Sequence, residues 1–246
     1  MRTASDVAIC ERAAALFPPL GNETGWSARF GRELNATDDR HSFEPPGAGD
    51  LPVVEGKHVE PFRARLHAAE RSIQTANARR LIDSRRYERA RLAYRDVAGA
   101  TNRLTLIAAI LPAWCVSTHT LFCLRSPLPL TSQYYLCGLF NSFIVNYLVR
   151  MRVTTHVTTA TVERLPIAPP GHSPSAEREI SALARVLSRR EDPVAFSHLQ
   201  ALAASLYQLT SDEFRHVLDT FPLIEKEIKD AAYDTYLATE TRRTLS

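Results

Sequence analysis

The alternation of apolar and polar positions is clearest in the middle of the chain. Three short stretches rich in β-branched, aromatic and aliphatic residues, 91–97, 104–111 and 120–124, are separated by polar connections at 99–103 and 112–119. A fourth stretch, 51–59, has the same character and contains Gly56 at a bend. Runs of this length between turn residues are typical of strands. The pattern therefore predicts one small mixed or antiparallel sheet built from all four stretches.

Helical spacing is found on both sides of these strands. Residues 4–17 space their apolar positions as a helix does, with Ser5 as the expected N-cap, and two prolines follow. Residues 62–90 contain good helix formers, but their apolar positions are too sparse for a deeply buried helix, which favours a solvated face. The apolar run at 132–149 predicts one long buried helix. Caps and prolines predict four more helices, at about 175–189, at 193–209, from Thr210 or Ser211 onward, and at about 222–239.

Together these elements predict an α+β fold. We expect a small sheet domain with a long buried helix, followed by a C-terminal helical unit. The expected boundaries are a first helix within residues 1–20, the α+β domain over 21–170, and the helical unit over 171–246. A chain of 246 residues with 45% apolar composition is long enough to bury one substantial core or two small ones.

Neither secretion nor a metal site is indicated. Cys10, Cys115, Cys123 and Cys137 are scattered, with no C-x-x-C pair, so no disulfide framework or zinc site is expected. Charged residues interrupt the first 20 positions, which excludes a recognisable signal peptide. The apolar run at 134–149 is shorter than the roughly 20 residues of a membrane helix. We therefore expect a cytoplasmic protein without a membrane partner.

Charge is unevenly distributed along the sequence. The 30 basic and 27 acidic residues give a net charge of only +3, which does not by itself indicate a nucleic-acid partner. Residues 57–103, however, contain 12 basic and 5 acidic residues, whereas residues 1–56 contain 5 and 9. Nearly all the basic residues are arginines, a bias that a G+C-rich genome also produces. The basic middle of the chain favours a polyanionic partner.

Six stretches occur in an order that resembles one family. They are GWSARFGRELNATDD (25–39), LPVVEGKHVEPF (51–62), YRDVAGATNRLTLIAAILP (94–112), LFNSFIVNYLVRMRV (139–153), LPIAPP (165–170) and LYQLTSDEFRHVLDTFP (206–222). In this order they are similar to the C-terminal specificity region of restriction-modification adenine-specific DNA methyltransferases, namely the TaqI-like and type IIG enzymes and their phage-defence relatives. Two departures from the family pattern are ATDD at 36–39 and Val54 in place of an aromatic residue.

The resemblance implies that catalysis belongs to a different domain. In this family a preceding domain binds S-adenosylmethionine and holds a flipped adenine with an N-P-P-Y motif. Neither that motif nor an F-x-G-x-G loop occurs in this sequence. The resemblance therefore implies a DNA target-recognition domain over 21–170, with no cofactor of its own and no activity alone. Its expected partners are double-stranded DNA and, in a split system, a separate methyltransferase chain; a truncated remnant is the other interpretation.

Candidate DNA contacts follow from residue type and place. Arginine and lysine contact phosphates, while Arg, Asn, Ser, Thr and His side chains also reach base edges. We expect Lys57, beside Gly56, to contact phosphate and Arg103 to read a base, with both lining one concavity together with two further arginines. The full set of candidates is Lys57, Asn102, Arg103, Ser117, Thr118, His119, Arg150, Arg152 and His156.

Each candidate also has a purely structural interpretation. Lys57 could be a solvated lysine, Asn102 a turn residue, residues 117–119 loop caps, and Arg150 and Arg152 cations at a helix C-terminus. Asp38, Asp39 and His41 could form an acid-base or metal cluster, but a loop rich in Gly and Pro also holds such residues merely solvated, and no hydrolase or P-loop motif occurs. The alternative function is a non-catalytic interaction module that no longer binds DNA and uses its C-terminal helices on a protein partner.

Overall fold

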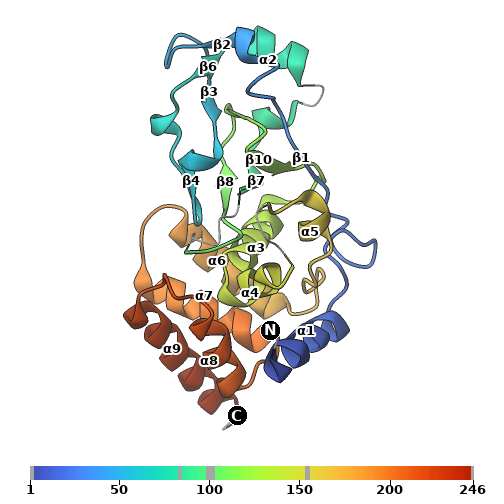
Figure 1. The fold of residues 1–246 in the computed structure, drawn as a ribbon, viewed down its shortest axis with the longest axis vertical. Coiled ribbons are helices and arrows are strands. Elements are labelled where there is room, and N and C mark those ends of the chain that lie inside the picture. The colour runs from blue at the N-terminus through green and yellow to red at the C-terminus, as the bar shows by residue number, and fades with distance from the viewer. Residues whose placement is uncertain (1–2, 83–84, 98–102, 153–155, 245–246) are drawn as a thin grey trace.

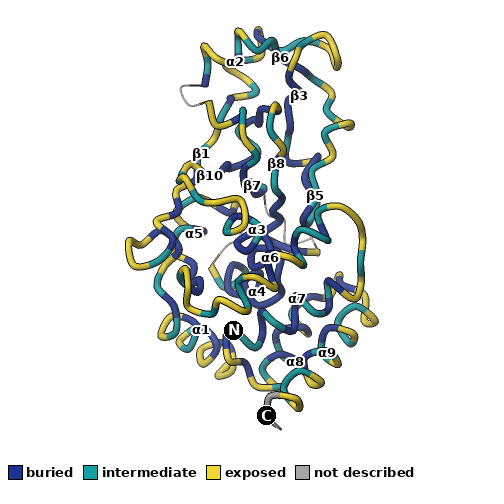
Figure 2. The backbone as a smooth tube through the Cα atoms, turned by 180° about the vertical axis from the view of Figure 1, so that it is seen from behind, coloured by how far each residue is buried: buried dark blue, intermediate teal, exposed yellow. Residues whose placement is uncertain are grey.

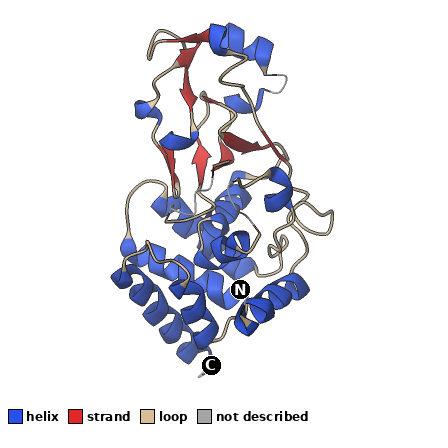
Figure 3. Cartoon of the chain, in the orientation of Figure 1, coloured by secondary structure: helices blue, strands red, loops and turns tan. Residues whose placement is uncertain are grey.

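The computed structural model describes residues 3–82, 85–97, 103–152 and 156–244, without the side chains of 243 and 244. The molecule is elongated, with the strands towards one end and most helices at the other (Figures 1 and 3). Both chain ends lie at the helical end (Figure 1). The combination of small, mainly antiparallel sheets with several helices confirms the predicted α+β class.

The central sheet is antiparallel and has the strand order β1-β10-β7-β8. It consists of β1 (Phe30–Gly31), β7 (Arg91–Arg95), β8 (Ala108–Leu111) and β10 (Leu121–Leu124). Strand β7 is paired on both sides, so that Tyr94 lies opposite Ala108 and Phe122. The strands predicted at 91–97, 104–111 and 120–124 are therefore confirmed, each somewhat shorter than expected.

A second sheet lies at the end of the molecule opposite to most of the helices (Figure 1). Its order is β2-β6-β3-β9, and β3 pairs with β9 in parallel. The prediction that residues 51–59 join the same sheet as 91–124 is therefore wrong. The strands are β2 (Phe43–Glu44), β3 (Leu51–Val54), β6 (Ser72–Ile73) and β9 (Val116–Ser117), and a separate hairpin joins β4 (Val59–Glu60) to β5 (Arg63–Ala64).

The segment 62–90 contains little helix. The only α-helix among its described residues is α2 (Thr75–Leu81). Short 3-10 turns, η3 (Leu66–Ala68) and η4 (Arg85–Glu88), and strands β5 and β6 take up much of the rest. The sparse apolar positions explain this outcome, because a helix without an apolar stripe gains little from packing. Other short turns are η1 (Arg40–Ser42) and η2 (Gly56–His58), the latter forming the bend predicted at Gly56.

The remaining helices form the other half of the molecule. They are α1 (Ala4–Leu16), α3 (Leu130–Phe140), α4 (Phe143–Arg150), α5 (Thr159–Glu163), α6 (Pro174–Leu187), α7 (Pro193–Leu206), α8 (Ser211–Asp219) and α9 (Lys226–Thr244). Thr3 caps α1, not Ser5 as expected, and Thr210 caps α8 as expected. The helix α5 was not predicted, because its Thr-rich sequence indicated a loop.

The predicted helix at 132–149 is two helices, α3 and α4, broken at Asn141 and Ser142. Ser142 caps α4 by accepting a hydrogen bond from the backbone N–H of Val145. The prediction of burial is confirmed, because both helices lie at the dark centre of the tube in Figure 2. At Gly138 in α3, a Cβ atom would lie 2.6 Å from Ile180 of α6, so glycine allows these helices to approach closely.

Two buried asparagines connect the helix break to the central sheet. The Asn146 Oδ1 accepts hydrogen bonds from the N–H groups of Thr105 and Leu106 at 2.9 and 2.7 Å. Its Nδ2 donates to two carbonyls at the break. Asn141 accepts from the Ala108 N–H at 3.1 Å and donates to the Ala108 carbonyl at 2.8 Å. These amides supply hydrogen bonds to buried backbone groups between the helices and the sheet, among them the N–H groups of Thr105 and Leu106.

We predict that Asn146→Leu lowers the free energy of unfolding by about 3 kcal/mol or more. The substitution removes the side-chain partner of the N–H groups of Thr105 and Leu106 and of the Phe140 carbonyl, and each buried group left unsatisfied costs about 1–3 kcal/mol. Urea denaturation measures the loss. The control is Asn22→Ala, at an exposed turn where the side chain accepts one hydrogen bond, from the Glu23 N–H. Equal losses in both variants would contradict this interpretation.

A carboxylate ties α1 to two other helices. The Asp6 Oδ1 accepts hydrogen bonds from the Tyr147 hydroxyl at 2.5 Å and from the His216 Nε2 at 2.8 Å. Asp6 is nearly buried, with a relative exposure of 7%. The hydrogen bond from Tyr147 and that from His216 hold the pKa of Asp6 well below its usual value. A carboxyl with a lowered folded-state pKa stabilises the fold above its unfolded pKa, and this contribution is lost as the pH falls.

We therefore predict that Asp6→Asn reduces stability at neutral pH and flattens its dependence on acid. Between about pH 5 and about pH 2, the variant should lose less unfolding free energy than the native chain, because it no longer carries the depressed carboxyl. Thermal melting across this range measures the effect. The matched control, Asp234→Asn on the exposed side of α9, should leave the acid profile unchanged; an unchanged profile for Asp6→Asn would refute the prediction.

Candidate nucleic-acid interface

Lys57, the expected phosphate contact, forms ion pairs with two carboxylates. Its Nζ lies 2.7 Å from an Oε of Glu70 and 3.2 Å from an Oε of Glu55. The hydrogen bond to Glu70 raises the pKa of Lys57, so the side chain stays charged. Its charge is nevertheless balanced locally by two anions, and a phosphate would have to displace them.

Residues 117–119 lie mostly inside the molecule. Ser117 is completely buried, and both its backbone N–H and its hydroxyl donate to Glu33, at 2.8 and 2.9 Å. Thr118 is completely buried as well, with its hydroxyl 2.9 Å from that of Thr120. Neither of these side chains, which we expected to contact DNA, is exposed in this structure. His119 is half-buried, and its Nδ1 accepts a hydrogen bond from the Ala36 N–H at 3.1 Å.

Arg150 holds interior segments together. Its Nε donates to the Thr105 hydroxyl at 2.9 Å and its Nη1 to the Thr220 carbonyl at 2.6 Å, and the guanidinium lies 4.1 Å from the centre of the Phe221 ring. Arg103, whose carbonyl accepts a further bond from Arg150, is exposed and pairs with Glu225 at 3.0 Å. Arg150 thus has a structural role. Arg103 contacts Glu225, which lies in the connection between α8 and α9.

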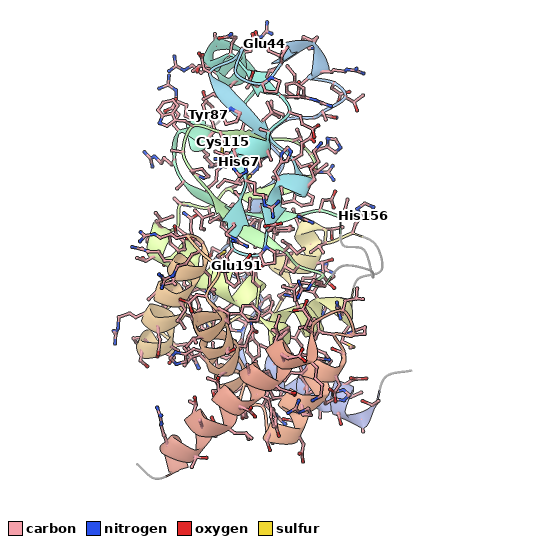
Figure 4. The ribbon with its side chains drawn as sticks, turned by 90° about the vertical axis from the view of Figure 1, so that its left-hand side faces the viewer. Glu44, His67, Tyr87, Cys115, His156 and Glu191 are labelled. Atoms are coloured by element: carbon pink, nitrogen blue, oxygen red, sulfur yellow. The ribbon has the colours of Figure 1, made fainter. Side chains whose placement is uncertain are left out.

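Arg152 and His156 contact segments of the chain other than those that Lys57 and Arg103 contact. The Arg152 Nη1 donates to the Arg164 carbonyl at 3.1 Å. His156 is exposed, 3.4 Å from Asp96, and stands at the edge of the molecule in Figure 4. Asn102 lies outside the described residues. The expected single concavity lined by Lys57, Arg103, Arg150 and Arg152 is not found, because Lys57 is beside the strands whereas Arg103 and Arg150 contact the helical end.

Ion pairs divide the basic block of the sequence into two halves. In the first half, 57–71, every described cation pairs with a carboxylate. Besides Lys57, Arg63 lies 2.6 Å from Glu191, Arg65 bonds Glu60, and Arg71 lies 3.9 Å from Glu55. This surface is close to electrically balanced.

In the second half, 79–89, four of the five arginines have no carboxylate partner among the described residues. Arg79, Arg80, Arg86 and Arg89 are exposed and have no hydrogen-bond or ion-pair partner within the described part of the chain. Arg85 is also exposed, and it pairs with Glu88 at 3.7 Å. The sparse apolar positions of this segment predicted a solvated face, and the adjacent arginines at 79–80 and 85–86 are the sequence signal that indicates a basic surface.

A small cavity joins these arginines to the central sheet. About 240 Å³ in volume, it is lined by Arg86, by Arg32 beside β1 and Arg125 beside β10, and by apolar Leu81 and Ile82. Both oxygens of Glu33, which also lines the cavity, are bound by the buried Arg91 at 2.6 and 2.7 Å. The negative charge of Glu33 is therefore compensated by Arg91, and the other charged residues that line the cavity are Arg32, Arg86 and Arg125.

We call the set Arg32, Arg79, Arg80, Arg85, Arg86, Arg89 and Arg125 the arginine surface. The segment that follows α2 and the segments beside β1 and β10 meet at the cavity. In both Figure 1 and Figure 2, α2 and β1 lie toward the same side of the molecule. Arg32 also pairs with Asp96 at 2.9 Å and stacks on the Phe122 ring, which orients it. The three guanidinium groups that line the cavity, those of Arg32, Arg86 and Arg125, suit phosphate, because each fork can donate two hydrogen bonds.

A second group of arginines follows α6. A groove of about 830 Å³ is lined by Arg178, Arg185, Arg189 and Arg190 together with Glu177. Arg190 pairs with Asp192 at 3.1 Å, and Arg185 lies over the Tyr134 ring. This groove is the larger hollow, and each of the two hollows has engaged arginines and one lining carboxylate. The smaller cavity, however, adjoins a segment with four exposed arginines that have no partner among the described residues. The arginine surface is therefore the stronger candidate for a polyanion.

The possible acid-base cluster at 38–41 is a turn. The Asp39 carboxylate accepts from the Asn35 N–H at 2.7 Å, and that of Asp38 accepts from the Asn35 side chain at 2.5 Å. A search of the described residues finds no group of His, Cys, Asp and Glu side chains arranged to hold a metal ion. Nor does any helix in the described ranges have the length and apolarity to span a bilayer.

Comparison with known proteins gives only a distant likeness. No family model and no curated protein matches the sequence. Among solved structures, the chain is similar to one from a study of the assembly and conformational transition of a type I R-M system, with a TM-score of 0.37 and 14% identity. It is also similar to the HsdS subunit from Thermoanaerobacter tengcongensis, with a TM-score of 0.36 and 12% identity.

The alignments cover 93% and 94% of this chain but only 51% of either neighbour. The chain thus spans about half the length of these neighbours. At such low TM-scores the likeness supports no conclusion about what the chain binds or does.

Proposed function

We propose that this chain binds double-stranded DNA as the target-recognition part of a cytoplasmic restriction-modification methyltransferase. The observation that carries the proposal is the arginine surface, where four exposed arginines, Arg79, Arg80, Arg86 and Arg89, have no partner among the described residues and one of them, Arg86, lines a cavity together with Arg32 and Arg125. The six sequence stretches, in the order typical of adenine-specific enzymes of the TaqI-like and type IIG kind, give the cluster its biological setting.

A DNA duplex is a dense array of negative charges. DNA presents about one negative charge per 1.7 Å of its axis, and a bound arginine releases condensed counterions. The four arginines of 79–89 that have no described partner can do so without breaking an existing ion pair. The cations of 57–71 would first have to leave their carboxylates, which cancels much of the gain.

The finer assignments extend the same proposal. We assign the interface to residues 21–170 and expect methyl transfer to adenine to be carried out by a domain that binds S-adenosylmethionine, in a phage-defence setting. Among the candidates predicted from the sequence, exposed Arg103 and half-buried His119 are the side chains we still assign to DNA contact, whereas Lys57 gives way to the arginine surface.

We predict that alanine substitutions on the arginine surface weaken DNA binding uniformly across sequences. Arg86→Ala should reduce the slope of log K against log[salt] by roughly 1, and the double variant with Arg89→Ala by roughly 2. Fluorescence anisotropy with a labelled duplex at several salt concentrations measures both. Lys57→Ala and Arg63→Ala are the matched controls, because each removes a cation that is already paired.

The outcome separates this proposal from its alternative. Unchanged slopes in the controls and reduced slopes in the arginine variants support it. Equal slopes in all variants, or no saturable binding by the native chain, would favour the interaction module that no longer binds DNA.

We further predict that the chain alone binds duplex DNA but neither binds S-adenosylmethionine nor transfers a methyl group, because the sequence contains no F-x-G-x-G loop and no N-P-P-Y motif. Calorimetric titration with the cofactor should give only the heat of dilution. Sinefungin, a cofactor analogue, serves as a second titrant. Saturable binding of either compound at micromolar concentration would refute the prediction.

A further inference from the structure

Trp114 is a large aromatic side chain left in solvent beside the arginine surface. Its relative exposure is 52%, and the other exposed large hydrophobic residues of the described chain are aliphatic. The second tryptophan, Trp26, is buried at 5% exposure and donates its Nε1 hydrogen to the Ala168 carbonyl at 2.8 Å. A single exposed apolar side chain is ordinary on a protein surface, so the case for a partner depends on what lies beside the Trp114 ring and on how the ring is held.

The backbone places Trp114 directly against the arginine segment. Its N–H donates to the Tyr87 carbonyl in η4 at 2.7 Å. Tyr87, the residue after Arg86, is completely buried and so anchors η4 in the core. Figure 4 shows Tyr87 and Cys115, the residue after Trp114, close together in the strand-rich half. The aromatic ring and the unpaired guanidinium groups thus belong to one neighbourhood.

The loop that carries Trp114 is held in a rigid shape. Trp114 has a φ of +62°, in the left-handed region that a bulky side chain rarely adopts. The Cys115 carbonyl accepts from the buried Arg91 at 2.9 Å, and the Cys115 thiol donates to the Pro112 carbonyl at 3.2 Å. Contacts on both sides of Trp114 therefore fix its unusual backbone. The ring is held in solvent by a constrained loop, which preorganises it for a partner.

We propose that Trp114 stacks on an unstacked base of DNA bound to the arginine surface. This inference rests on the proposed function. A partner here must satisfy guanidinium groups and an aromatic face within one neighbourhood, and a nucleic acid provides phosphates and base faces together. In a duplex, a base face becomes accessible only where a base pair opens or a step is kinked. Trp114 therefore contributes to recognition of locally opened duplex and is not expected to read a base by hydrogen bonds.

Tryptophan fluorescence tests the stacking directly. In the variant Trp114→Phe, buried Trp26 is the remaining tryptophan and serves as an internal control. Titration with a duplex containing a central mismatch should quench the native chain saturably, at the midpoint given by anisotropy. The emission of Trp114→Phe should stay constant while the variant still binds. A perfectly paired duplex of the same sequence should quench less.

Binding measurements provide the second arm. Trp114→Gly, which accepts the left-handed backbone without strain, should weaken binding to the mismatched duplex by roughly 5- to 150-fold, the range that loss of one stacked base gives. Trp114→Phe should retain most of the affinity. Val194→Ala, at a site 79% exposed on α7, is the control for loss of an exposed apolar group and should change nothing.

The outcomes distinguish this inference from the proposed function. If the arginine variants weaken binding but native emission is unchanged at saturation, or if Trp114→Gly binds the mismatched duplex as the native chain does, the stacking role is wrong and the proposed function stands. If neither the arginine variants nor the Trp114 variants alter binding, both fail. Circular dichroism melting of Trp114→Gly verifies that the variant is folded.

Discussion

The side-chain amides of Asn141 and Asn146 satisfy the backbone groups at the junction between the helices and the central sheet. Asn141 bonds both the N–H and the carbonyl of Ala108 at the start of β8. From the other side, Gln200 of α7 accepts from the Phe143 N–H at 2.7 Å. An unsatisfied buried polar group costs about 1–3 kcal/mol, so few alternative arrangements of this junction are tolerated. The asparagines thus hold β8, which pairs with β7 in the central sheet. Arg32 and Arg125 of the arginine surface lie beside β1 and β10 of the same sheet.

Pairing of charges, more than their number, determines where this molecule can attract a polyanion. The sequence shows one basic block, but the fold gives carboxylate partners to Lys57, Arg63 and Arg65 and not, among the described residues, to Arg79 or Arg86. Two acidic residues from distant positions, Glu70 and Glu191, contribute to this division. Net charge along a sequence is insensitive to such partners, because they are set by tertiary structure. The same reasoning explains why Lys57 was a plausible but weak choice.

Local patterns predicted the elements better than their assembly. The strands at 91–124 and the C-terminal helices followed from turn residues, caps and prolines. The break at Asn141 and Ser142 was overlooked, although a Ser three residues before Val145 is a recognisable cap inside an apolar run. The separate second sheet could not be predicted, since it depends on a parallel pairing of β3 with β9, which lie far apart in the sequence. Trp114 was missed because the 112–119 connection was judged by its polar residues alone.

Two hydrophobic clusters give the two halves of the molecule different roles. The large cluster runs from α1 through the central sheet to α9, whereas a small one, in the half that carries most of the arginine surface, is formed by Leu34, Leu51, Val53, Ile73, Ala78, Ile82, Tyr87 and Val116. A small core supports only limited stability, so this half is expected to open before the body does. The buried pair Glu33–Arg91 offsets that weakness, because it bonds Ser117 and Cys115 on the strand side. The Glu33–Arg91 pair thus connects the loop that carries Trp114 to the wall of the cavity lined by Arg86.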